Sequence, residues 1–325
     1  MSKDIRIEEY RSEMAAAWDA HVDASNNGTL FHTQAFLGYH EGKTATGFRH
    51  LLFHRGGKLA AVLPMGTDPD GDGMEWRSPY GASFGGFVTA DNQYAHHQDL
   101  IGAFLLHAES RGARKVRITP PPACYHRQAD SALEFLLMRN GFRLESRDLC
   151  QAIDLSALPP GDPLPTYAYA CEKQIRKAER LGLEVRPMDD LAAFHSMLVD
   201  NRAKHGVAPT HALEHLKRLR DRIPAAFHLF GAYNAGVLEA ATLAFAANPK
   251  ALLNFYTCHR DEAAGSGAAN LVNHHVIRWA REKGFGYYDF GTSSLRMEPN
   301  EGLIRFKESF GGGAVLRDTY VWEPS

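Results

Sequence analysis

The sequence predicts an α/β fold (α+β in the order of its elements) with two tandem domains, each a mixed sheet flanked by helices. Three observations lead to this prediction. The 325 residues correspond to about two domains of ~150 residues each. The order hairpin, helix, strand occurs twice, and a proline-rich break separates the two occurrences. Hydrophobic residues make up 44% and charged residues 23%, which allows a sizeable core in each half.

Each half begins its repeat with a β-hairpin. RHLLFHRGGKLAAVLPM, residues 49–65, reads as two strands around a Gly56-Gly57 turn. HLFGAYNAGVLEAATLAF, residues 228–245, reads as two strands around a turn at 234–236. When the second glycine of the first turn is superposed on Gly236, the apolar positions that follow also align.

A helix ending in glycine and then a strand follow each hairpin. These segments are LIGAFLLHAESRGARKVRIT, residues 100–119, and LVNHHVIRWAREKGFGYYDFGT, residues 271–292. Gly112 and Gly284 hold the same position after the helix, where a left-handed residue commonly ends it. The simplest explanation is a divergent internal duplication, and chance similarity of two α/β halves is the alternative.

The boundary between the halves is expected in LSALPPGDPLPTY, residues 155–167, where four prolines and a glycine interrupt all periodicity. We therefore predict one domain over 1–157 and a second over 166–325. In the second half we expect helices at about 168–181, 189–203, 211–222 and 268–283, and another around Lys307.

Charge and cysteine usage limit the possible functions. The net charge of -2 gives no global basic field, so we expect no DNA partner, and any polyanion contact must come from a local patch. The four cysteines are far apart without a CxxC pair, which is typical of reduced thiols. Neither a signal core nor an apolar run of ~18 residues appears, so we expect a cytoplasmic protein without a transmembrane segment.

A lysine lies within an apolar helical arc near the end of the chain. In NEGLIRFKESFGGG, residues 300–313, helical spacing places Lys307 between Leu303 and Ile304. A buried ammonium is costly unless an anion meets it, so Lys307 is a catalytic candidate that would face a phosphate or a developing oxyanion. The alternative is that its stem lies over Leu303 and its ammonium reaches water.

A second catalytic candidate lies on a strand. In an acyl-transfer fold, two neighbouring strands must open so that a carbonyl can lie between them and free N–H groups can stabilise an oxyanion. The strands FYTCH, residues 255–259, and YYDFGTS, residues 287–293, are placed to do this. Asp289 faces away from its neighbours Tyr288 and Phe290, and would orient or deprotonate an attacking amine. A structural carboxylate near the strand end is the alternative.

Phosphate-binding candidates occur in two places. Arg260 and the loop Gly265-Ser266-Gly267 precede a helix, whose free N–H groups and dipole favour an anion. On the helix YACEKQIRKAERLG, residues 169–182, the basic side chains fall on one stripe that could hold phosphates of a nucleotide-linked precursor or of tRNA. The stripe contains Lys173, Arg176, Lys177 and Arg180. The alternatives are a flexible helix-capping loop and an ordinary solvated helix face.

Substrate-pocket candidates come from both halves. WRSPYGASFGGFV, residues 76–88, has the serine, tyrosine and glycines of a loop that approaches a ligand, with Tyr80 and Ser83 as its candidates, although a tight β-connection is equally consistent. Tyr256 and Phe306 are the candidates in the second half. HALEH, residues 211–215, fits an inverted zinc-protease pattern, but no third ligand follows, so we expect no metal site.

These motifs together resemble a known family. NEGLIRFKESFGG resembles the G-L-x-x-F-K-x-x-F-[GN] signature of the FemAB-like aminoacyl/acyltransferases, and YYDFGTS resembles their [YF]-[YF]-D-[FL]-G segment. KQIRKAERLGLEV, residues 173–185, resembles their R-x-x-R-K-A-x-x-x-G segment, with lysine in place of the first arginine. NGTLFHTQAFLGYH, residues 27–40, and LAAVLPM, residues 59–65, resemble the opening of the first half.

The resemblance implies two fused GNAT-like domains, the second of which carries the donor site, and an acyltransferase that moves an activated acyl group to an amine without a permanent cofactor. It implies that Lys307 stabilises transition-state charge or contacts tRNA, and that Arg176 and Lys177 bind phosphate. The short connection between the helices near 203 and 211 leaves no room for the coiled-coil arm of some members, so the chain resembles the compact armless form.

The donor stays open between two co-substrates. The R-x-x-x-x-G-S-G-A loop is nearer to a CoA-type pyrophosphate loop, whereas characterised members of the family use aminoacyl-tRNA. We therefore expect a GNAT-type N-acyltransferase acting on a small-molecule or peptide amine, in peptidoglycan or exopolysaccharide biosynthesis. The alternatives are an aminoacyl-tRNA-dependent transferase that extends a peptidoglycan stem peptide, and a non-catalytic, degenerate acyltransferase that only binds a ligand.

Overall fold

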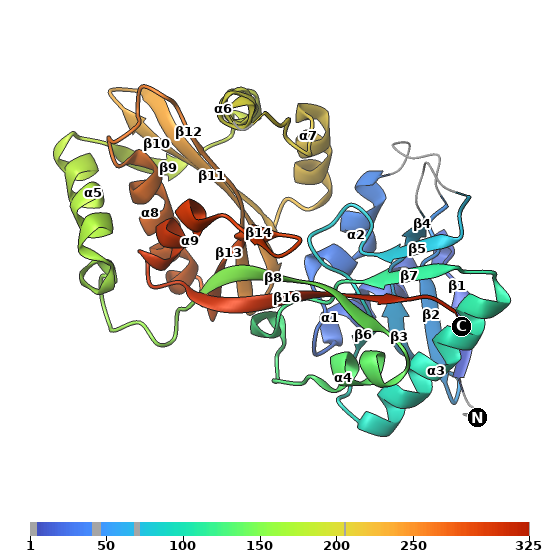
Figure 1. Ribbon diagram of the computed structural model, residues 1–325. Coiled ribbons are helices and arrows are strands. Elements are labelled where there is room, and N and C mark those ends of the chain that lie inside the picture. The colour runs from blue at the N-terminus through green and yellow to red at the C-terminus, as the bar shows by residue number, and fades with distance from the viewer. Residues whose placement is uncertain (1–4, 41–46, 68–71, 205, 325) are drawn as a thin grey trace. The chain divides into compact units, whose positions relative to one another are not determined.

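The computed structural model describes residues 5–40, 47–67, 72–204 and 206–324 (Figure 1). The chain divides into two compact units. Unit 1 consists of Met1–Asp148 and Leu316–Ser325, and unit 2 is Leu149–Val315. Two long strands, β8 (Arg143–Asp154) and β16 (Gly313–Trp322), each contain a boundary between the units.

Unit 1 contains two groups of hydrogen-bonded strands. The first is antiparallel in the order β1-β2-β3-β6, and in the second β5 pairs with β4 and, in parallel, with β7, which also pairs with β16. The turn between β2 and β3 has positive φ at Gly56 and Gly57 (53° and 78°), as two-residue hairpin turns require. The strands are β1 (Ile5–Glu9), β2 (Leu51–Arg55), β3 (Lys58–Leu63), β4 (Gly66–Thr67), β5 (Glu75–Ser78), β6 (Val88–Thr89) and β7 (Lys115–Ile118).

The helices of unit 1 close its cores. Leu100, Ile101 and Phe104 of α3 are buried against Phe53 of β2 and Trp76 of β5 in one apolar cluster. A second, smaller apolar cluster includes buried side chains of α1. The helices are α1 (Ala15–Ala24), α2 (Gln34–Leu37), α3 (Tyr94–Ser110) and α4 (Ala132–Arg139).

Unit 2 contains a single mixed sheet in the order β8-β13-β12-β11-β10-β9. All neighbours are antiparallel except β12 and β13, which run parallel and are joined through helix α8. A small separate hairpin, β14–β15, follows β13. The strands are β9 (Glu184–Pro187), β10 (Phe227–Asn234), β11 (Val237–Asn248), β12 (Ala251–His259), β13 (Tyr287–Thr292), β14 (Ser294–Leu295) and β15 (Glu298–Pro299).

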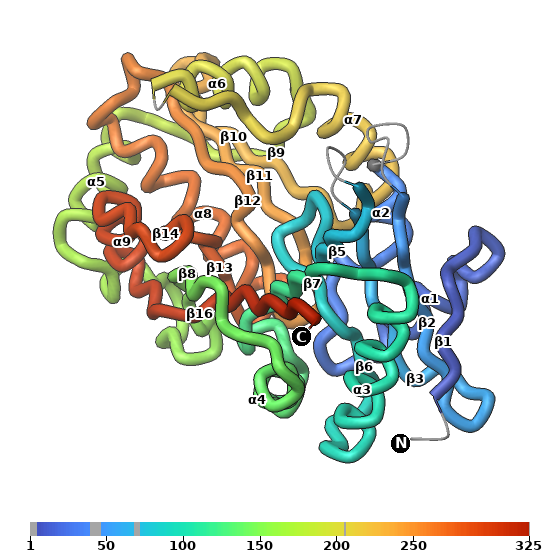
Figure 2. The backbone as a smooth tube through the Cα atoms, turned by 45° about the vertical axis from the view of Figure 1, so that its right-hand side comes forward, coloured from blue at the N-terminus to red at the C-terminus, as the bar shows by residue number. Residues whose placement is uncertain are grey.

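Helices cover both faces of the sheet in unit 2. Helices α5 and α8 pack against one face, where Ile175 and Val276 join Leu252 and Tyr288 in a continuous apolar core. Figures 1 and 2 show α6 and α7 on the other face. The helices are α5 (Tyr169–Arg180), α6 (Leu191–Ala203), α7 (Leu213–Arg222), α8 (Ala268–Glu282) and α9 (Glu301–Glu308).

The structure confirms the mixed α/β architecture, and both predicted hairpins are present as β2–β3 and β10–β11. The helices expected in the second half agree with α5 to α8 within about two residues. By its contacts, the segment Leu316–Ser325 groups with unit 1. As limits of domains, 1–157 and 166–325 stay a prediction.

The burial of α9 differs from its apolar pattern. Leu303 is 37% exposed, whereas Lys307 is 4% exposed and is the buried residue of this helix. The reason is that α9 turns the side carrying Lys307 toward the end of β13, and Phe306 packs only at the margin of the core. The alternative in which the ammonium of Lys307 reaches water is therefore wrong.

Among the residues that the structure describes, we find no helix with both the length and the apolar character needed to cross a bilayer.

Candidate functional site

The parallel strands β12 and β13 separate after a short ladder. Their register runs from Ala251–Tyr287 to Leu253–Asp289 and ends there. Strand β12 continues along β11 as far as His259, whereas Gly291, with φ 71°, turns β13 away from it. The ladder therefore ends as the predicted opening requires, and the backbone of β12 beyond Leu253 has no ladder partner on that side.

A bulge on β12 lies at the same level. Leu243 of β11 pairs with Tyr256, and Ala244 pairs with Asn254, so Phe255 is the additional residue. A bulge bends the strand and increases its local twist. The bend begins just past the last β12–β13 pair, and so it helps the two strands to diverge.

The N-terminus of α8 follows a glycine-rich loop. Gly267 is the N-cap with φ 86°, Gly265 has φ 79°, and the Ser266 hydroxyl accepts a hydrogen bond from Ala268 N at 3.2 Å. The next N–H groups of the first turn have no partner within the helix, because an α-helix leaves its first donors unused. Free donors of this kind, together with the helix dipole, favour an anion.

Helix α5 lies against this loop. A Cβ at Gly267 would lie 2.1 Å from Gln174 O of α5, so only glycine permits so close an approach. Lys177 Nζ, also on α5, donates to Gly265 O at 2.7 Å. The structure therefore brings together three of the predicted phosphate-binding elements: the glycine loop, the start of α8 and Lys177.

The other two basic candidates are engaged with acidic neighbours. Arg176 pairs with Glu172 on its own helix at 2.7 Å, and Arg260 contacts Glu262 at 3.4 Å beyond the end of β12. Both guanidinium groups are largely exposed. Exposed pairs of this kind are weak, so a ligand phosphate would compete for either arginine at little cost.

Lys307 connects α9 to the end of β13. Its Nζ donates to Gly291 O at 2.6 Å and to Thr292 O at 2.9 Å, at the point where β13 leaves β12. An ammonium has three N–H groups, and these two carbonyls use two of them. The charge is thus fixed beside the separating strands.

Asp289 lies on the same stretch of β13. It is 1% exposed, and its Oδ1 accepts from Gly291 N at 2.7 Å. Burial lowers the pKa of Lys307 from 10.5 to about 8, although the negative charge of Asp289 opposes this change. The two predicted catalytic residues therefore belong to one buried electrostatic unit, in which the pKa of Lys307 is lowered to about 8.

Tyr256 and Phe306 lie on different elements of unit 2. Tyr256 is 8% exposed, and burial raises the pKa of its phenol, which lies 2.9 Å from His211 Nδ1. Phe306 of α9 packs edge-on against Phe310, with the two ring centroids 5.2 Å apart. His211 is thus part of a hydrogen-bonded pair over β12, and no group of three or more metal-ligating side chains occurs in the described residues.

The two candidates from the first half lie in unit 1, on the segment after β5. Tyr80 packs against Gly66, and the centroids of the Tyr80 and Phe48 rings are 6.2 Å apart. Ser83 O accepts a long hydrogen bond of 3.5 Å from Arg317. Their role in a substrate pocket stays a prediction.

A buried polar cluster at the strand opening was not anticipated from the sequence. Asn254 of β12, Asn273 of α8 and Tyr288 of β13 meet within hydrogen-bond distance. The available signal was a polar residue in the middle of an apolar strand, ALLNFYTCH, followed by a second asparagine in the helix that crosses it. Periodicity alone gives no reason to connect the two.

Comparison with known proteins agrees with this geometry. Residues 167–307 match the family model described as an acetyltransferase (GNAT) domain. None of the curated proteins matches the sequence. Among solved structures, FemX superposes with a TM-score of 0.73 at 13% identity, over 98% of this chain and 97% of FemX.

Two further structures are similar over nearly the whole chain. L-PGS from Bacillus licheniformis has a TM-score of 0.63 at 13% identity, covering 98% of this chain and 94% of L-PGS. A tandem GNAT protein from the clavulanic acid biosynthesis pathway has a TM-score of 0.56 at 13% identity, covering 99% and 100%. The chain therefore has a tandem GNAT fold like that of FemX, and residues 167–307 match the GNAT domain model.

Proposed function

We propose that this tandem GNAT protein is an N-acyltransferase that moves an acyl group from a CoA thioester to a small-molecule or peptide amine. The observation that supports it most directly is the β12–β13 ladder, which ends after Leu253–Asp289. The glycine-capped start of α8, the helix that joins these two strands, is the proposed phosphate site. An acyl-CoA donor needs both features, because its thioester carbonyl would lie between the strands while its phosphates bind at the helix.

The donor phosphates would bind at the start of α8. The N–H groups of Ala269 and Asn270 supply donors, and Lys177, held by Gly265 O, supplies a positive charge beside them. CoA as the donor is also consistent with the similar tandem GNAT protein of the clavulanic acid pathway, whose structure is described as "without AcCoA".

The chemistry is a direct displacement. The lone pair of the amine forms a C–N bond to the thioester carbonyl, the oxyanion collapses, the C–S bond breaks, and the CoA thiolate takes up the proton that the amine loses. Backbone N–H groups of β12 beyond Leu253 would stabilise the oxyanion. Burial raises the pKa of the Cys258 thiol to about 12, so this cysteine is protonated and unsuited to form a covalent intermediate.

Lys307 and Asp289 would act together at the end of β13. The ammonium of Lys307 places a positive charge beside the carbonyl as it becomes negative, and low solvent access strengthens that effect. Asp289 holds the chain at Gly291 and keeps Lys307 partly protonated. Asp289 would also orient the incoming amine.

Binding of coenzyme A, measured by isothermal titration calorimetry, tests the donor site. We expect wild-type protein to bind CoA without tRNA, and Lys177→Met to weaken binding by about tenfold, because one charged contact is lost. Lys58→Met, at the start of β3 in unit 1, is the matched control. Thiol release from acetyl-CoA with a panel of amines then tests transfer. Failure of CoA to bind would contradict the proposal.

A second candidate donor is aminoacyl-tRNA, with a peptidoglycan stem-peptide amine as acceptor. Helix α5 buries Ile175 and exposes the basic stripe of Lys173, Arg176, Lys177 and Arg180 defined above, which fits a phosphate backbone. The similarity to FemX supports the same direction at the level of fold. Salt-sensitive tRNA binding that is lost when the four side chains are neutralised would favour this donor.

The setting that we propose for either donor is the cytoplasm, in the synthesis of a peptidoglycan precursor or an exopolysaccharide. None of the four cysteines forms a disulfide, which fits a reducing compartment.

A further inference from the structure

Three polar side chains from three elements meet inside the core of unit 2. Asn254 Nδ2 lies 2.8 Å from Asn273 Oδ1 and 2.9 Å from the Tyr288 hydroxyl, which itself donates to Asn273 Oδ1 at 3.0 Å. Asn273 and Tyr288 are fully buried, and Asn254 is 8% exposed. We call these three residues the amide–phenol cluster.

The cluster lies at the end of the β12–β13 ladder. Tyr288 belongs to the second of the three strand pairs, and Asn254 is the first residue of β12 past the last pair. The hydrogen bonds of the cluster thus continue from side chain to side chain where the backbone ladder stops. They connect β12, β13 and α8 at this level.

Further bonds extend the cluster to its surroundings. Asn273 Nδ2 donates to Ala269 O at 2.8 Å, in the first turn of α8. On the sheet, the hydroxyl of Thr257 donates to Asn254 Oδ1 at 3.1 Å and lies 3.0 Å from the hydroxyl of Thr242 on β11. The first turn of α8 is thereby tied to three strands through oriented bonds.

Such a cluster is a poor choice for stability alone. Burying amides and a phenol costs free energy unless each finds partners, and apolar side chains would fill the same core position without that requirement. A satisfied polar network instead selects one arrangement of the elements that carry it. Here those elements carry the proposed oxyanion donors on β12 and the proposed phosphate site on α8.

We infer that Asn254, Asn273 and Tyr288 are positioning residues, which fix the start of α8 relative to the opening between β12 and β13. This inference rests on the proposed function: the phosphate end of the donor and its carbonyl must be held at one separation for the amine to attack. Small misplacement of reacting groups costs rate more than it costs binding.

The test compares two neighbouring tyrosines of β13. Tyr288→Phe removes the hydroxyl from the cluster, whereas Tyr287→Phe removes a hydroxyl that lies 3.5 Å from Asp154, outside the cluster. With acetyl-CoA and an amine found in the screen above, we expect Tyr288→Phe to lower kcat by about tenfold with the Kd for CoA unchanged. Tyr287→Phe should change neither quantity.

A milder pair of variants covers the case in which Tyr288→Phe fails to fold. Thr257→Val removes the outer hydroxyl bond to Asn254, and Thr257→Ser keeps it. We expect the valine variant to lose kcat several-fold and the serine variant to restore it.

Two outcomes would overturn the inference. One is a folded Tyr288→Phe with the kcat of Tyr287→Phe, and the other is a parallel loss of kcat, CoA affinity and melting temperature, which indicates a purely structural role. If wild-type protein neither binds CoA nor releases thiol, the proposed function itself has failed and the inference falls with it. That result differs from an active wild type whose Tyr288→Phe variant is unchanged.

Discussion

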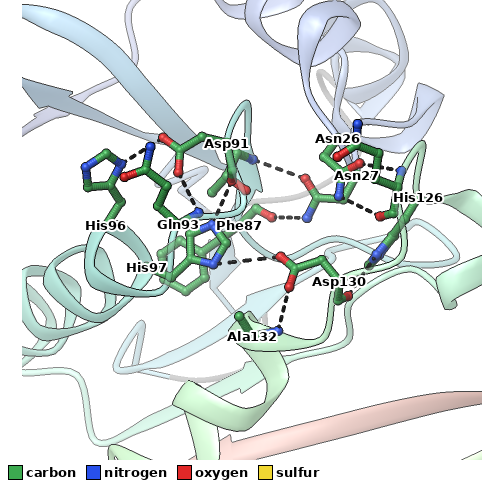
Figure 3. A network of polar contacts seen from close by, with 12 residues as sticks. Asn26, Asn27, Phe87, Asp91, Gln93, His96, His97, His126, Asp130 and Ala132 are labelled. Carbon is green, nitrogen blue, oxygen red and sulfur yellow. Dashed lines mark hydrogen bonds and ion pairs between the residues drawn. The ribbon is translucent and has the colours of Figure 1, made fainter.

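Helices α3 of unit 1 and α8 of unit 2 each follow a β-hairpin in sequence, but their N-termini differ. Before α3, Asp91 accepts from Gln93 N at 2.9 Å and contacts His96 Nδ1 at 2.9 Å, within the polar network drawn in Figure 3. Burial alone would raise the pKa of Asp91, but the hydrogen bonds from Gln93 and His96 hold it below its usual value. Before α8 stand Gly265, Ser266 and Gly267, with no acidic side chain.

The comparison indicates how one order of elements serves two purposes. At α3, Asp91 accepts from the N–H of Gln93, the residue that precedes the helix, and Figure 3 shows His97 and Asp130 joined to the same network. At α8, Ser266 accepts from the N–H of Ala268, and we propose that the next donors bind an anion from outside. An occupied helix end stabilises the fold, whereas an open one is available for binding.

The parallel strand pairs of the two units also differ, because one stays paired along its length and the other does not. In unit 1, β5 and β7 stay paired along their whole length, from Glu75–Lys115 to Ser78–Ile118. In unit 2, β12 and β13 part after Leu253–Asp289. Only the second pair therefore leaves backbone donors beside an open edge, which is why we assign the chemistry to unit 2.

The largest expected effect is at the end of β13. Lys307→Ala removes a buried positive charge, and we expect kcat to fall by about 100-fold or more, as for loss of an oxyanion-stabilising group. Thiol release measures the rate, and CoA affinity and the melting temperature serve as controls. If transfer continues at the wild-type rate while ligand affinity falls, the non-catalytic binding module becomes the better description.

The next effect concerns the closeness of α5 to α8. In Gly267→Ala the new methyl group meets Gln174 O at 2.1 Å, and the backbone has φ 86°. We expect the free energy of unfolding in urea to fall by about 3 kcal/mol. In the matched variant Gly236→Ala, φ is 81° but nothing lies within 4 Å, so we expect about 1 kcal/mol. Equal losses would contradict the close packing.

The third effect is a dependence on pH. Because burial lowers the pKa of Lys307 to about 8, kcat should decline as pH rises above that value and the ammonium is lost. Between about 8 and 10.5 the unfolded chain binds the proton and the folded chain does not, so the contribution of Lys307 to stability rises with pH there. Urea unfolding of Lys307→Met should lack this rise; its persistence would assign it to another group.

The smallest effect tests unit 1. Asp91→Asn weakens the charge-assisted bonds before α3, and we expect the free energy of unfolding to fall by about 1 kcal/mol with kcat unchanged. Thermal unfolding and thiol release are the measurements. A tenfold change in kcat, about 1.4 kcal/mol, would mean that the network around Asp91 takes part in transfer.

The sequence predicts elements better than it predicts the site. Glycine turns and apolar alternation locate both hairpins, and helical spacing locates α8 and the burial of Lys307. Helical spacing places Leu303 in the same apolar arc as Lys307, yet Leu303 is 37% exposed, because tertiary packing decides which face of an eight-residue helix turns inward. The bonds from Lys307 to Gly291 O and Thr292 O involve backbone carbonyls, which no side-chain pattern reveals.

The amide–phenol cluster shows the same limit. Asn254 and Tyr288 are separated by 34 positions, and only the parallel register of β12 with β13 brings them together. Local patterns describe one element at a time, whereas this contact depends on which strand lies beside which.

Strand β16 has a consequence for how the chain is made. Thr119 and Thr319 share a hydrogen bond of 2.9 Å although 200 residues separate them, and β16 pairs with β7 at the same place. A ribosome delivers the chain from its N-terminus, so the continuous segment 149–315 emerges before the residues that complete unit 1. The earlier part of unit 1 must therefore wait through most of translation with the edge of β7 uncovered, and the unit that begins first is finished last.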